Sequence, residues 1–271
     1  PRTAIPSIIV CCPSEREPRT LVIEPSIEYS AIQSAYCSLK LASLIREVNK
    51  IESLHWIRIL YMYPDEIEDD VLVAMKECDK VLPYFDIPMQ HANNRLLEKM
   101  NRRGKKEDVV KLVEKIRSMF ENPTLRTTVI VGFPSETEEE FEELVEFIQD
   151  IKWDRLGAFT YSKEEDTPAY DMTPEVDEED ANRRLDILMS IQKQISLQSN
   201  LNKIGKTIEV LVEEKEGLKD QYRGRSAADA PDEVDGQVIF KCEERELDLG
   251  SFVQVEITDA NEYDLFGVCK G

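Results

Sequence analysis

The stretch Arg126-Thr-Thr-Val-Ile-Val-Gly-Phe-Pro-Ser-Glu-Thr137 decides how this chain is expected to fold. It begins as a β-branched apolar run, which favours a strand, and the run stops at Gly-Phe-Pro. An acidic segment follows whose apolar residues share one face of a helix, namely Phe141, Leu144, Val145 and Ile148. Ser135 stands three residues before Glu138, the spacing of a capping box, and is expected to start that helix. Such a junction often binds anionic or nucleotide-like ligands, although an ordinary βα turn has the same local pattern.

Short apolar runs alternate with amphipathic segments on both sides of this junction. Strands are expected at residues 56–62, 81–87, 125–131 and 155–161, and helices at 39–49, 67–78, 93–100, 105–120 and 135–151. This alternation predicts parallel strands joined by right-handed crossovers, in a barrel or an open doubly wound sheet. In a (β/α) barrel the functional site lies at the carboxyl ends of the strands.

The pattern of the sequence changes in its last quarter. Short strands at 208–212, 237–240 and 252–257, separated by glycine-bearing turns, suggest a small antiparallel barrel of OB-like size. We therefore predict an α/β fold, in which a partial, TIM-like (β/α) barrel precedes a small all-β barrel. The expected parts are the (β/α) barrel over residues 1–175, a connecting helix over 176–202 and the β-barrel over 203–271. Residues 8–34 show no clear period.

The chain is strongly acidic. It has 271 residues and a formal net charge of −21, from 34 basic and 55 acidic side chains. Such a surface repels the phosphate backbone of nucleic acids, which proteins normally bind through Lys and Arg. It would attract a basic partner, although acidic surfaces also serve solubility alone. Residues 203–271 share the bias, with 9 basic and 17 acidic side chains, so a basic protein is favoured over RNA.

Neither a membrane segment nor a metal site can be read from the sequence. No apolar run is long enough to span a bilayer, and the first residues lack a signal-peptide pattern. We therefore expect a cytosolic chain that does not act at a membrane. The six cysteines, at positions 11, 12, 37, 78, 242 and 269, show no CxxC or CxxxCxxC spacing. We assign no metal ligand among them and expect them to stay reduced.

Several segments taken together resemble the radical S-adenosylmethionine (SAM) methylthiotransferases. In the first part of the chain the resemblance lies in Ala4-Ile-Pro-Ser-Ile8, Asp86-Ile-Pro-Met-Gln-His91, the junction quoted above and Leu156-Gly-Ala-Phe-Thr-Tyr-Ser-Lys-Glu164. Arg225-Ser-Ala-Ala-Asp-Ala-Pro-Asp-Glu-Val-Asp-Gly236 and Asn261-Glu-Tyr-Asp-Leu-Phe-Gly267 resemble the TRAM barrel of that family. The resemblance covers roughly residues 39–271. It is strongest to the branch that modifies a small-subunit ribosomal protein.

The resemblance implies a reaction and two cofactors. Enzymes of this family reduce SAM with a 4Fe-4S iron–sulfur cluster held by a CxxxCxxC motif, and the radical formed abstracts a hydrogen atom from carbon. A methylthio group is then inserted, in this branch on the β-carbon of an aspartate of a basic ribosomal protein. Two alternatives remain open, a transfer-RNA adenosine methylthiotransferase and a non-catalytic binding module of the same fold. The acidic small barrel favours the protein substrate over RNA.

The chain departs from the family pattern at three points. Thr3 stands where the resemblance implies the last cluster cysteine, and threonine does not replace a thiolate ligand. The other two cysteines would precede Pro1, so we expect this chain alone to bind no cluster and to be inactive. Ser135 and Asp166 occupy positions where the family commonly has glycine.

The resemblance also assigns site residues, all of them near strand ends. Ile130 and Gly132 are expected to contact the adenine of SAM, and the other cofactor-binding candidates are Phe133, Gln90 and His91. Tyr161, Ser162 and Glu164 are expected to line the mouth of the site. Arg126 and His55 are interpreted as structural, and Trp153 and Phe159 as core residues. No catalytic residue is assigned.

Overall fold

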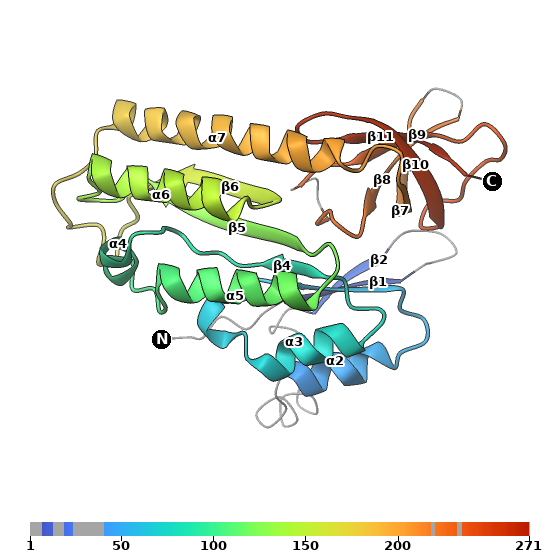
Figure 1. Cartoon of the computed structure of the whole chain (residues 1–271), viewed down its shortest axis with the longest axis horizontal. Helices are drawn as coiled ribbons and strands as arrows, with labels where there is room; N and C mark the ends of the chain where they lie inside the picture. Colours follow the sequence, from blue (N-terminus) through green and yellow to red (C-terminus); the bar gives the residue numbers. More distant parts are fainter. Residues whose placement is uncertain (1–6, 13–18, 24–40, 218–219, 232–234, 271) are drawn as a thin grey trace.

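The computed structural model describes residues 7–12, 19–23, 41–217, 220–231 and 235–270. They form a larger α/β part and a small β-barrel, joined by the long helix α7 (Figure 1). This arrangement confirms the predicted fold class. Thr3, expected at a cluster position, lies outside the described residues, as does most of the stretch from residue 8 to 38.

Four strands that run parallel lie at the centre of the larger part, the first in one three-stranded sheet and the other three in a second. They are β3 (Trp56–Leu60), β4 (Tyr84–Asp86), β5 (Thr124–Val131) and β6 (Arg155–Thr160). β5 pairs with β4 on one side and with β6 on the other. A parallel bridge between Ile57 and Val81 places β3 next to the segment that enters β4. The parallel order predicted from the alternating pattern is therefore confirmed from β3 onward.

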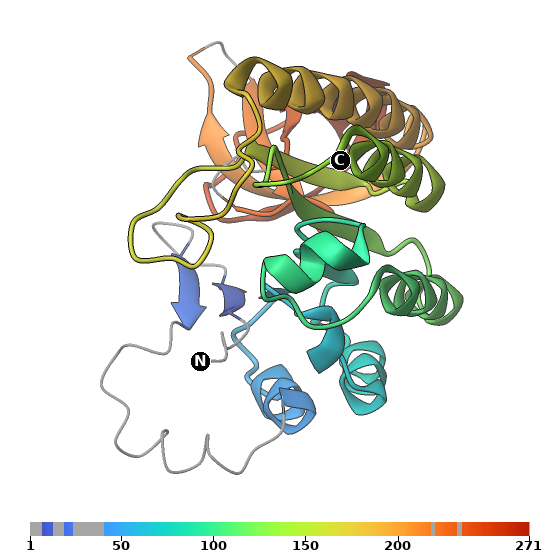
Figure 2. The same ribbon diagram turned by 90° about the vertical axis from the view of Figure 1, so that its left-hand side faces the viewer.

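Helices cover one face of these strands. They are α2 (Leu41–Asn49), α3 (Asp69–Glu77), α5 (Lys106–Met119) and α6 (Glu138–Ile151), with the short η1 (Pro64–Glu66) and α4 (Asn94–Lys99) between them. Figure 2 shows α3, α5 and α6 on one side of the strands and the loop of residues 161–177 on the other. The alternate residues of β5 that face the helices, such as Val129 and Val131, are buried against Leu144 and Ile148 of α6. The other face of β5 is left open for a site.

The first two described strands pair antiparallel. β1 (Ser7–Cys12) pairs antiparallel with β2 (Arg19–Ile23) and, on its other edge, antiparallel with β3. The strands of a (β/α) barrel all run parallel. This edge therefore departs from the barrel pattern, in the region where the sequence shows no clear period.

The junction after β5 differs from the prediction in its helix cap. α6 is capped by Thr137, whose side chain accepts the N–H of Glu140, while the Glu140 carboxylate accepts the N–H of Thr137. The prediction that Ser135 starts the helix is wrong, because its φ of 69° lies in the left-handed region. An N-cap residue needs an extended backbone, which Thr137 has at φ −87°.

Both positions where the family commonly has glycine have left-handed backbone. Ser135 has φ 69° and Asp166 has φ 63°. Glycine adopts this region without the cost of about 1–2 kcal/mol that an L residue bears. The glycine that the resemblance implies at these two positions is therefore the residue that this backbone geometry favours.

Helix α7 (Glu178–Leu201) connects the two parts and packs through a mostly polar stripe. Its buried residues are Ala181, Arg184, Leu188, Gln192, Ser196 and Asn200. Gln192 donates to the carbonyl of Trp153 at 2.8 Å, and Asn200 donates to that of Asn261 in the small barrel at 3.0 Å. The helix is thus tied to both parts of the chain. None of the helices in the described ranges is long and apolar enough to cross a membrane.

The small part is a closed barrel in the order β10-β11-β9-β8-β7. Its strands are β7 (Thr207–Lys215), β8 (Gln221–Ser226), β9 (Val238–Lys241), β10 (Phe252–Ala260) and β11 (Leu265–Cys269). The sequence predicted β7, β9 and β10 but neither β8 nor β11. β9 and β11 pair parallel, so the expectation of an entirely antiparallel barrel is wrong.

The barrel docks on the larger part through buried ion pairs at the amino ends of β5 and β6. Arg155, which begins β6, lies 2.8 Å from Asp229, and both side chains are almost completely buried. Ser226 donates its N–H and its hydroxyl to the same carboxylate, at 3.0 and 2.6 Å. Burial alone would raise the pKa of Asp229, but Arg155, Lys203 and the Ser226 hydrogen bond hold it below its ordinary value.

A second carboxylate of the same barrel segment completes the contact. Asp235 lies 3.2 Å from Arg126, whose other side meets Asp86 at 2.8 Å. Asp235 also accepts the hydroxyl of Tyr84 and the N–H of Ala230. Arg126 is therefore structural, as predicted.

An apolar seam lies beside these charges. Its buried members are Trp56, Leu82, Tyr84, Leu211 and Ala230. The ring of Phe252 on β10 lies 3.8 Å from that of His55, centroid to centroid, and 4.7 Å from that of Trp56. The structural role predicted for His55 is therefore confirmed as a contact between the two parts.

The buried pair of Arg155 and Asp229 gives a stability prediction. We expect Asp229→Ala to lower the free energy of unfolding by about 3–5 kcal/mol, because it leaves Arg155 buried without its counter-ion. The measurement is urea denaturation followed by circular dichroism. The matched control is Glu246→Ala, which breaks the solvent-exposed pair with Lys215 and should leave stability nearly unchanged. Equal effects of the two substitutions would contradict the proposed role of the buried pair.

The left-handed backbone of Ser135 gives a second prediction. We expect Ser135→Gly to raise the free energy of unfolding by up to about 1 kcal/mol, since glycine removes the cost of positive φ and adds a smaller entropic cost. The same substitution at Ser190, in the interior of α7, should lower it, because glycine is a poor helix former. Thermal denaturation of both variants measures whether each substitution raises or lowers stability. A loss of stability in both would show that the hydrogen bonds that the Ser135 hydroxyl accepts from Arg95 and Lys99 outweigh the relief of positive φ.

Candidate functional site

A pocket of about 570 Å³ lies on the open face of the sheet, at the carboxyl ends of β5 and β6. The end of α4 and the loop that follows β6 complete its walls. Five of the predicted site residues line it, namely Gln90, Ile130, Phe133, Tyr161 and Ser162. The strand ends thus converge on one site, as the parallel topology predicts.

The apolar surface of the pocket comes from neighbouring strands and the turn. Ile130 projects from the open face of β5, and Phe133 is buried with its ring 5.3 Å from that of Tyr161 in a T-shaped contact. Phe159 of β6 also lines the pocket and is 60% exposed. The prediction that Phe159 belongs to the core is therefore wrong, because the face of β6 that carries it is not covered by a helix. Trp153, in contrast, is fully buried as predicted.

Gln90 is fixed in the pocket by its backbone. Its N–H donates to the carbonyl of Thr128, and its own carbonyl accepts the N–H of Ile130, both at 2.8 Å. Its φ of 73° is left-handed, which is uncommon for a glutamine and is found at sites that the surrounding structure holds in place. Only 7% of the residue is exposed. The amide side chain is therefore presented to the pocket with little freedom.

His91 lies beneath the turn and does not line the pocket. It is fully buried, and its Nδ1 accepts the N–H of Asn93 at 3.0 Å. Its Nε2 lies 3.7 Å from Oε1 of Glu136. Asn93 in turn caps α4 by accepting the N–H of Leu96. The structure therefore places His91 where it supports the start of α4 and the turn after β5.

Gly132 also faces away from the pocket. Its φ is 73°, and a Cβ atom at this position would lie 2.6 Å from the Cβ of Ala181 on α7. The residue must be glycine because the helix approaches its backbone this closely. Gly132 thus sets the position of α7 against the end of β5, and its N–H points to Glu136.

Glu136 holds the turn and was not predicted as a functional residue. Its buried carboxylate accepts the N–H groups of Gly132 and Phe133 through Oε2, and its Oε1 lies 3.1 Å from Arg184 of α7. In the sequence it is one of several acidic residues near a helix start, which the helix dipole alone would favour. Only the fold shows that this carboxylate is turned back under the Gly-Phe-Pro turn.

The mouth residues differ in their environments. Ser162 donates its hydroxyl to Glu164 at 2.9 Å, and Glu164 itself is exposed and does not line the pocket. The hydroxyl of Tyr161 is buried and has no hydrogen-bond partner among the described residues. A buried hydroxyl without a partner is costly, and it is available to a polar atom of a ligand.

The rim formed by the end of α4 was missed in the sequence. Lys99, Met100, Asn101 and Arg102 line the pocket, opposite the apolar surface. None of the described residues lining this pocket is an aspartate or glutamate, although the chain carries a net charge of −21. The pocket is therefore electropositive on a strongly acidic protein.

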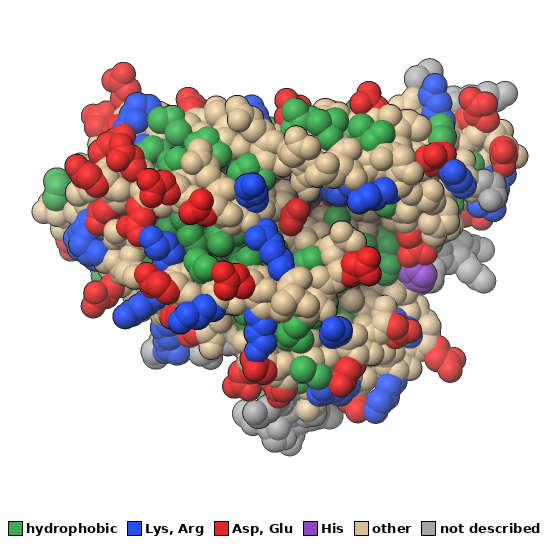
Figure 3. Space-filling model, viewed as in Figure 1, with side chains coloured by type: hydrophobic (Ala, Val, Ile, Leu, Met, Phe, Trp, Pro, Cys, Tyr) green, Lys and Arg blue, Asp and Glu red, His purple; other side chains and the backbone are tan. Residues whose placement is uncertain are grey.

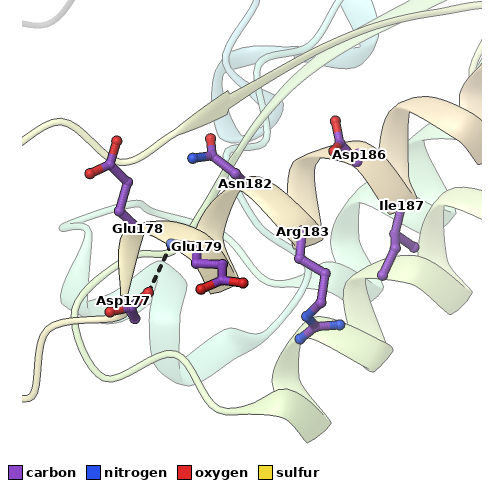
Figure 4. A pocket seen from close by; sticks show the side chains of 7 residues that line it. All are labelled: Asp177, Glu178, Glu179, Asn182, Arg183, Asp186 and Ile187. Carbon is purple, nitrogen blue, oxygen red and sulfur yellow. Dashed lines mark hydrogen bonds between the residues drawn. The ribbon is translucent and has the colours of Figure 1, made fainter.

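The acidic residues gather elsewhere. Figure 3 shows many of them at the end of the molecule where α6 and α7 begin. A hollow of about 830 Å³ lies there on the first turns of α7. Figure 4 shows Glu178 and Asp186 on one side of the helix and Arg183 on the other. Arg183 pairs with Glu138 of α6 and with Asp180. Arg183, the one cation among the described residues that line this hollow, is thus already paired. The hollow is a solvated helix surface.

The residues of the pocket fit SAM, whereas the described residues do not fit an iron–sulfur cluster. An apolar surface beside a free hydroxyl, an amide and cationic side chains matches a ligand with an aromatic base and a charged amino-acid end. No group of three or more His, Cys, Asp or Glu side chains in the described part of the chain is arranged to hold a metal. Cys242 and Cys269 lie in the small barrel, and Cys78 is buried after α3.

Comparison with known families agrees with this geometry. Residues 32–148 match the Radical SAM superfamily, and residues 204–269 match the TRAM domain. The first match contains the strand and turn of the pocket, and the second contains the small barrel. Among solved structures, coproporphyrinogen III oxidase from Escherichia coli, described as a radical SAM enzyme, is similar with a TM-score of 0.45 and 20% identity. That similarity covers 53% of this chain and 33% of that chain.

Curated relatives are much closer in sequence. The ribosomal protein uS12 methylthiotransferases RimO of Clostridioides difficile and Clostridium novyi are each 47% identical to this chain over 86% of its length. The RimO of Desulfitobacterium hafniense is 44% identical over 91% of it. The alignments cover 52–54% of these relatives, so the chain spans about half of their length. With its two domain matches and this level of identity, the chain belongs to the radical SAM methylthiotransferases of the RimO type.

Proposed function

We propose that this chain is the cofactor-binding barrel and TRAM part of a methylthiotransferase that acts on a ribosomal protein. The reaction would place a methylthio group on the β-carbon of an aspartate in the small-subunit protein uS12. The observation that carries this proposal is the pocket at the ends of β5 and β6, whose lining residues come largely from the segments that carry the family resemblance. A ribosomal substrate also implies that the protein works in the cytoplasm.

Within this proposal, different pocket residues contact different parts of the cofactor. Ile130, Phe133 and Phe159 would contact its adenosine part, while Gln90 and the free hydroxyl of Tyr161 would accept or donate hydrogen bonds. His91 and Gly132, assigned to the cofactor from the sequence, would act through the turn that carries Phe133. Ser162 and Glu164 would stand at the mouth. When bound beside a cluster, SAM supplies the radical, and the protein positions the ligand and excludes water.

The charge of the small barrel supports a basic protein partner. Its excess of acidic side chains would attract a ribosomal protein and repel the phosphates of transfer RNA. The barrel docks on the amino ends of β5 and β6, whereas the pocket lies at their carboxyl ends. Because β5 has eight residues, its two ends are roughly 23 Å apart at about 3.3 Å per residue step. A substrate held by the barrel must therefore extend along the open face of the sheet to reach the pocket.

The cofactor assignment predicts a selective effect of Phe159. We expect Phe159→Ala to weaken binding of SAM to this chain by about tenfold, because burying an aromatic ring contributes on the order of 1–3 kcal/mol. The matched control is Leu249→Ala, which removes another exposed apolar side chain, in a turn of the small barrel. Isothermal titration calorimetry measures both affinities. An unmodified chain that binds no SAM, or two variants that bind it equally well, would contradict the assignment.

The substrate assignment predicts the identity of the product. The protein encoded by the complete gene, reconstituted anaerobically with iron and sulfide, should add one methylthio group to uS12 in the presence of SAM, a sulfur source and a one-electron reductant. Tandem mass spectrometry should locate the group on an aspartate. The control replaces uS12 with transfer RNA, which should stay unmodified. Modification of an adenosine in the RNA would favour the transfer-RNA enzyme, and no modification of either would favour a binding module.

A further inference from the structure

We propose that Arg102 is the carboxylate-binding residue of the pocket. The inference rests on the proposed function and deepens it, because it names the chemical group that the cationic rim recognises. Both candidate ligands of the site carry a carboxylate, SAM on its amino-acid end and the substrate on its aspartate side chain. Four features of the structure support Arg102, namely the termination of α4, the freedom of the guanidinium, its aromatic neighbour and the charge of the pocket.

The backbone of Arg102 is fixed by the way α4 ends. The N–H of Asn101 donates to the carbonyl of Glu98 at 3.0 Å, and the N–H of Arg102 donates to that of Leu97 at 2.8 Å. Together with the left-handed φ of 55° at Asn101, these are the two hydrogen bonds of a Schellman motif. Arg102 is therefore held directly after the helix at a defined position on the rim.

The guanidinium of Arg102 is positioned but not neutralised. It lies over the ring of Tyr63, 5.4 Å from the centroid, and Tyr63 directly precedes η1, close to the carboxyl end of β3. No carboxylate of the described residues forms an ion pair with it, although the side chain is half-buried in the pocket wall. Arginine commonly stacks on an aromatic ring while its planar N–H groups bind a carboxylate in a bidentate manner.

The neighbouring cations are already engaged or lie outside the pocket. Lys99 donates to the hydroxyl of Ser135 at 2.6 Å, and Arg95 pairs with Glu140. Arg103 is exposed and is not among the residues that line the pocket. Lys99 keeps its charge, but its ammonium group is directed at Ser135, so among the described rim residues Arg102 is the cation whose N–H groups have no protein acceptor. On a chain with a net charge of −21, an unpaired arginine in a pocket without acidic lining residues among those described indicates an anionic ligand group.

The test compares ligands that differ only in the carboxylate. For the cofactor, the pair is SAM and decarboxylated SAM. For the substrate, the pair is a basic peptide with one aspartate and the same peptide with asparagine. Arg102→Gln should weaken binding of one carboxylate ligand by about tenfold or more, because it removes charge-assisted hydrogen bonds to that carboxylate. It should leave the partner without the carboxylate unchanged. Arg102→Lys should restore part of the loss, and Arg103→Gln is the matched control.

Isothermal titration calorimetry with the 271-residue chain distinguishes the outcomes. A selective loss for SAM places the carboxylate on the cofactor, and a selective loss for the aspartate peptide places it on the substrate. If Arg102→Gln changes both members of each pair equally, or neither, the assignment of Arg102 is overturned while the proposed function stands. If the unmodified chain binds neither SAM nor the aspartate peptide, the assignment of Arg102 is overturned as well, whereas the proposed function fails only if the reconstituted protein does not modify uS12.

Discussion

At the start of β5, Arg126 lies between Asp86 of the larger part and Asp235 of the small barrel, and the other contacts of the molecule are arranged around this strand. On the neighbouring strand β6, Arg155 likewise forms a buried ion pair with the small barrel, through Asp229. At the opposite end, β5 leads through Ile130 to the turn at Gly132, where α7 packs directly on the backbone. One strand therefore carries the docking contact at its amino end and the pocket at its carboxyl end. Helix α7 runs alongside and is tied to both parts.

Much of this architecture could be predicted from the sequence, since burial on one face leaves a periodic pattern. The strands from β3 to β6 and their helices follow such patterns. β8 does not, because Gln221-Tyr-Arg-Gly-Arg-Ser226 is polar and gains its partners only from closure of the barrel. The helix cap was misplaced because Ser135 and Thr137 are both followed three residues later by a glutamate. Backbone φ decides between them, and the sequence does not state it.

The site was predictable to the extent that strand ends define it. Gln90, Ile130, Phe133, Tyr161 and Ser162 converge because parallel strands end at the same edge. The cationic rim was not predictable, since it comes from a helix terminus whose approach to β5 depends on tertiary packing. Glu136 was hidden for a related reason: nothing in an acidic run marks the one carboxylate that turns inward. The residues that were not predicted thus owe their positions in the site to contacts between helices and strands.

The ion pairs between the two parts also determine how the chain can be divided. Composition changes near residue 203, and the barrel beyond it looks like a separable module. A fragment ending there would expose to water a surface on which Arg126 and Arg155 have lost Asp235 and Asp229. The barrel alone would keep two carboxylates that were buried against those arginines. For anyone dissecting the protein, the compositional boundary is therefore not a place to cut, and we expect the larger part and its barrel to depend on each other for stability.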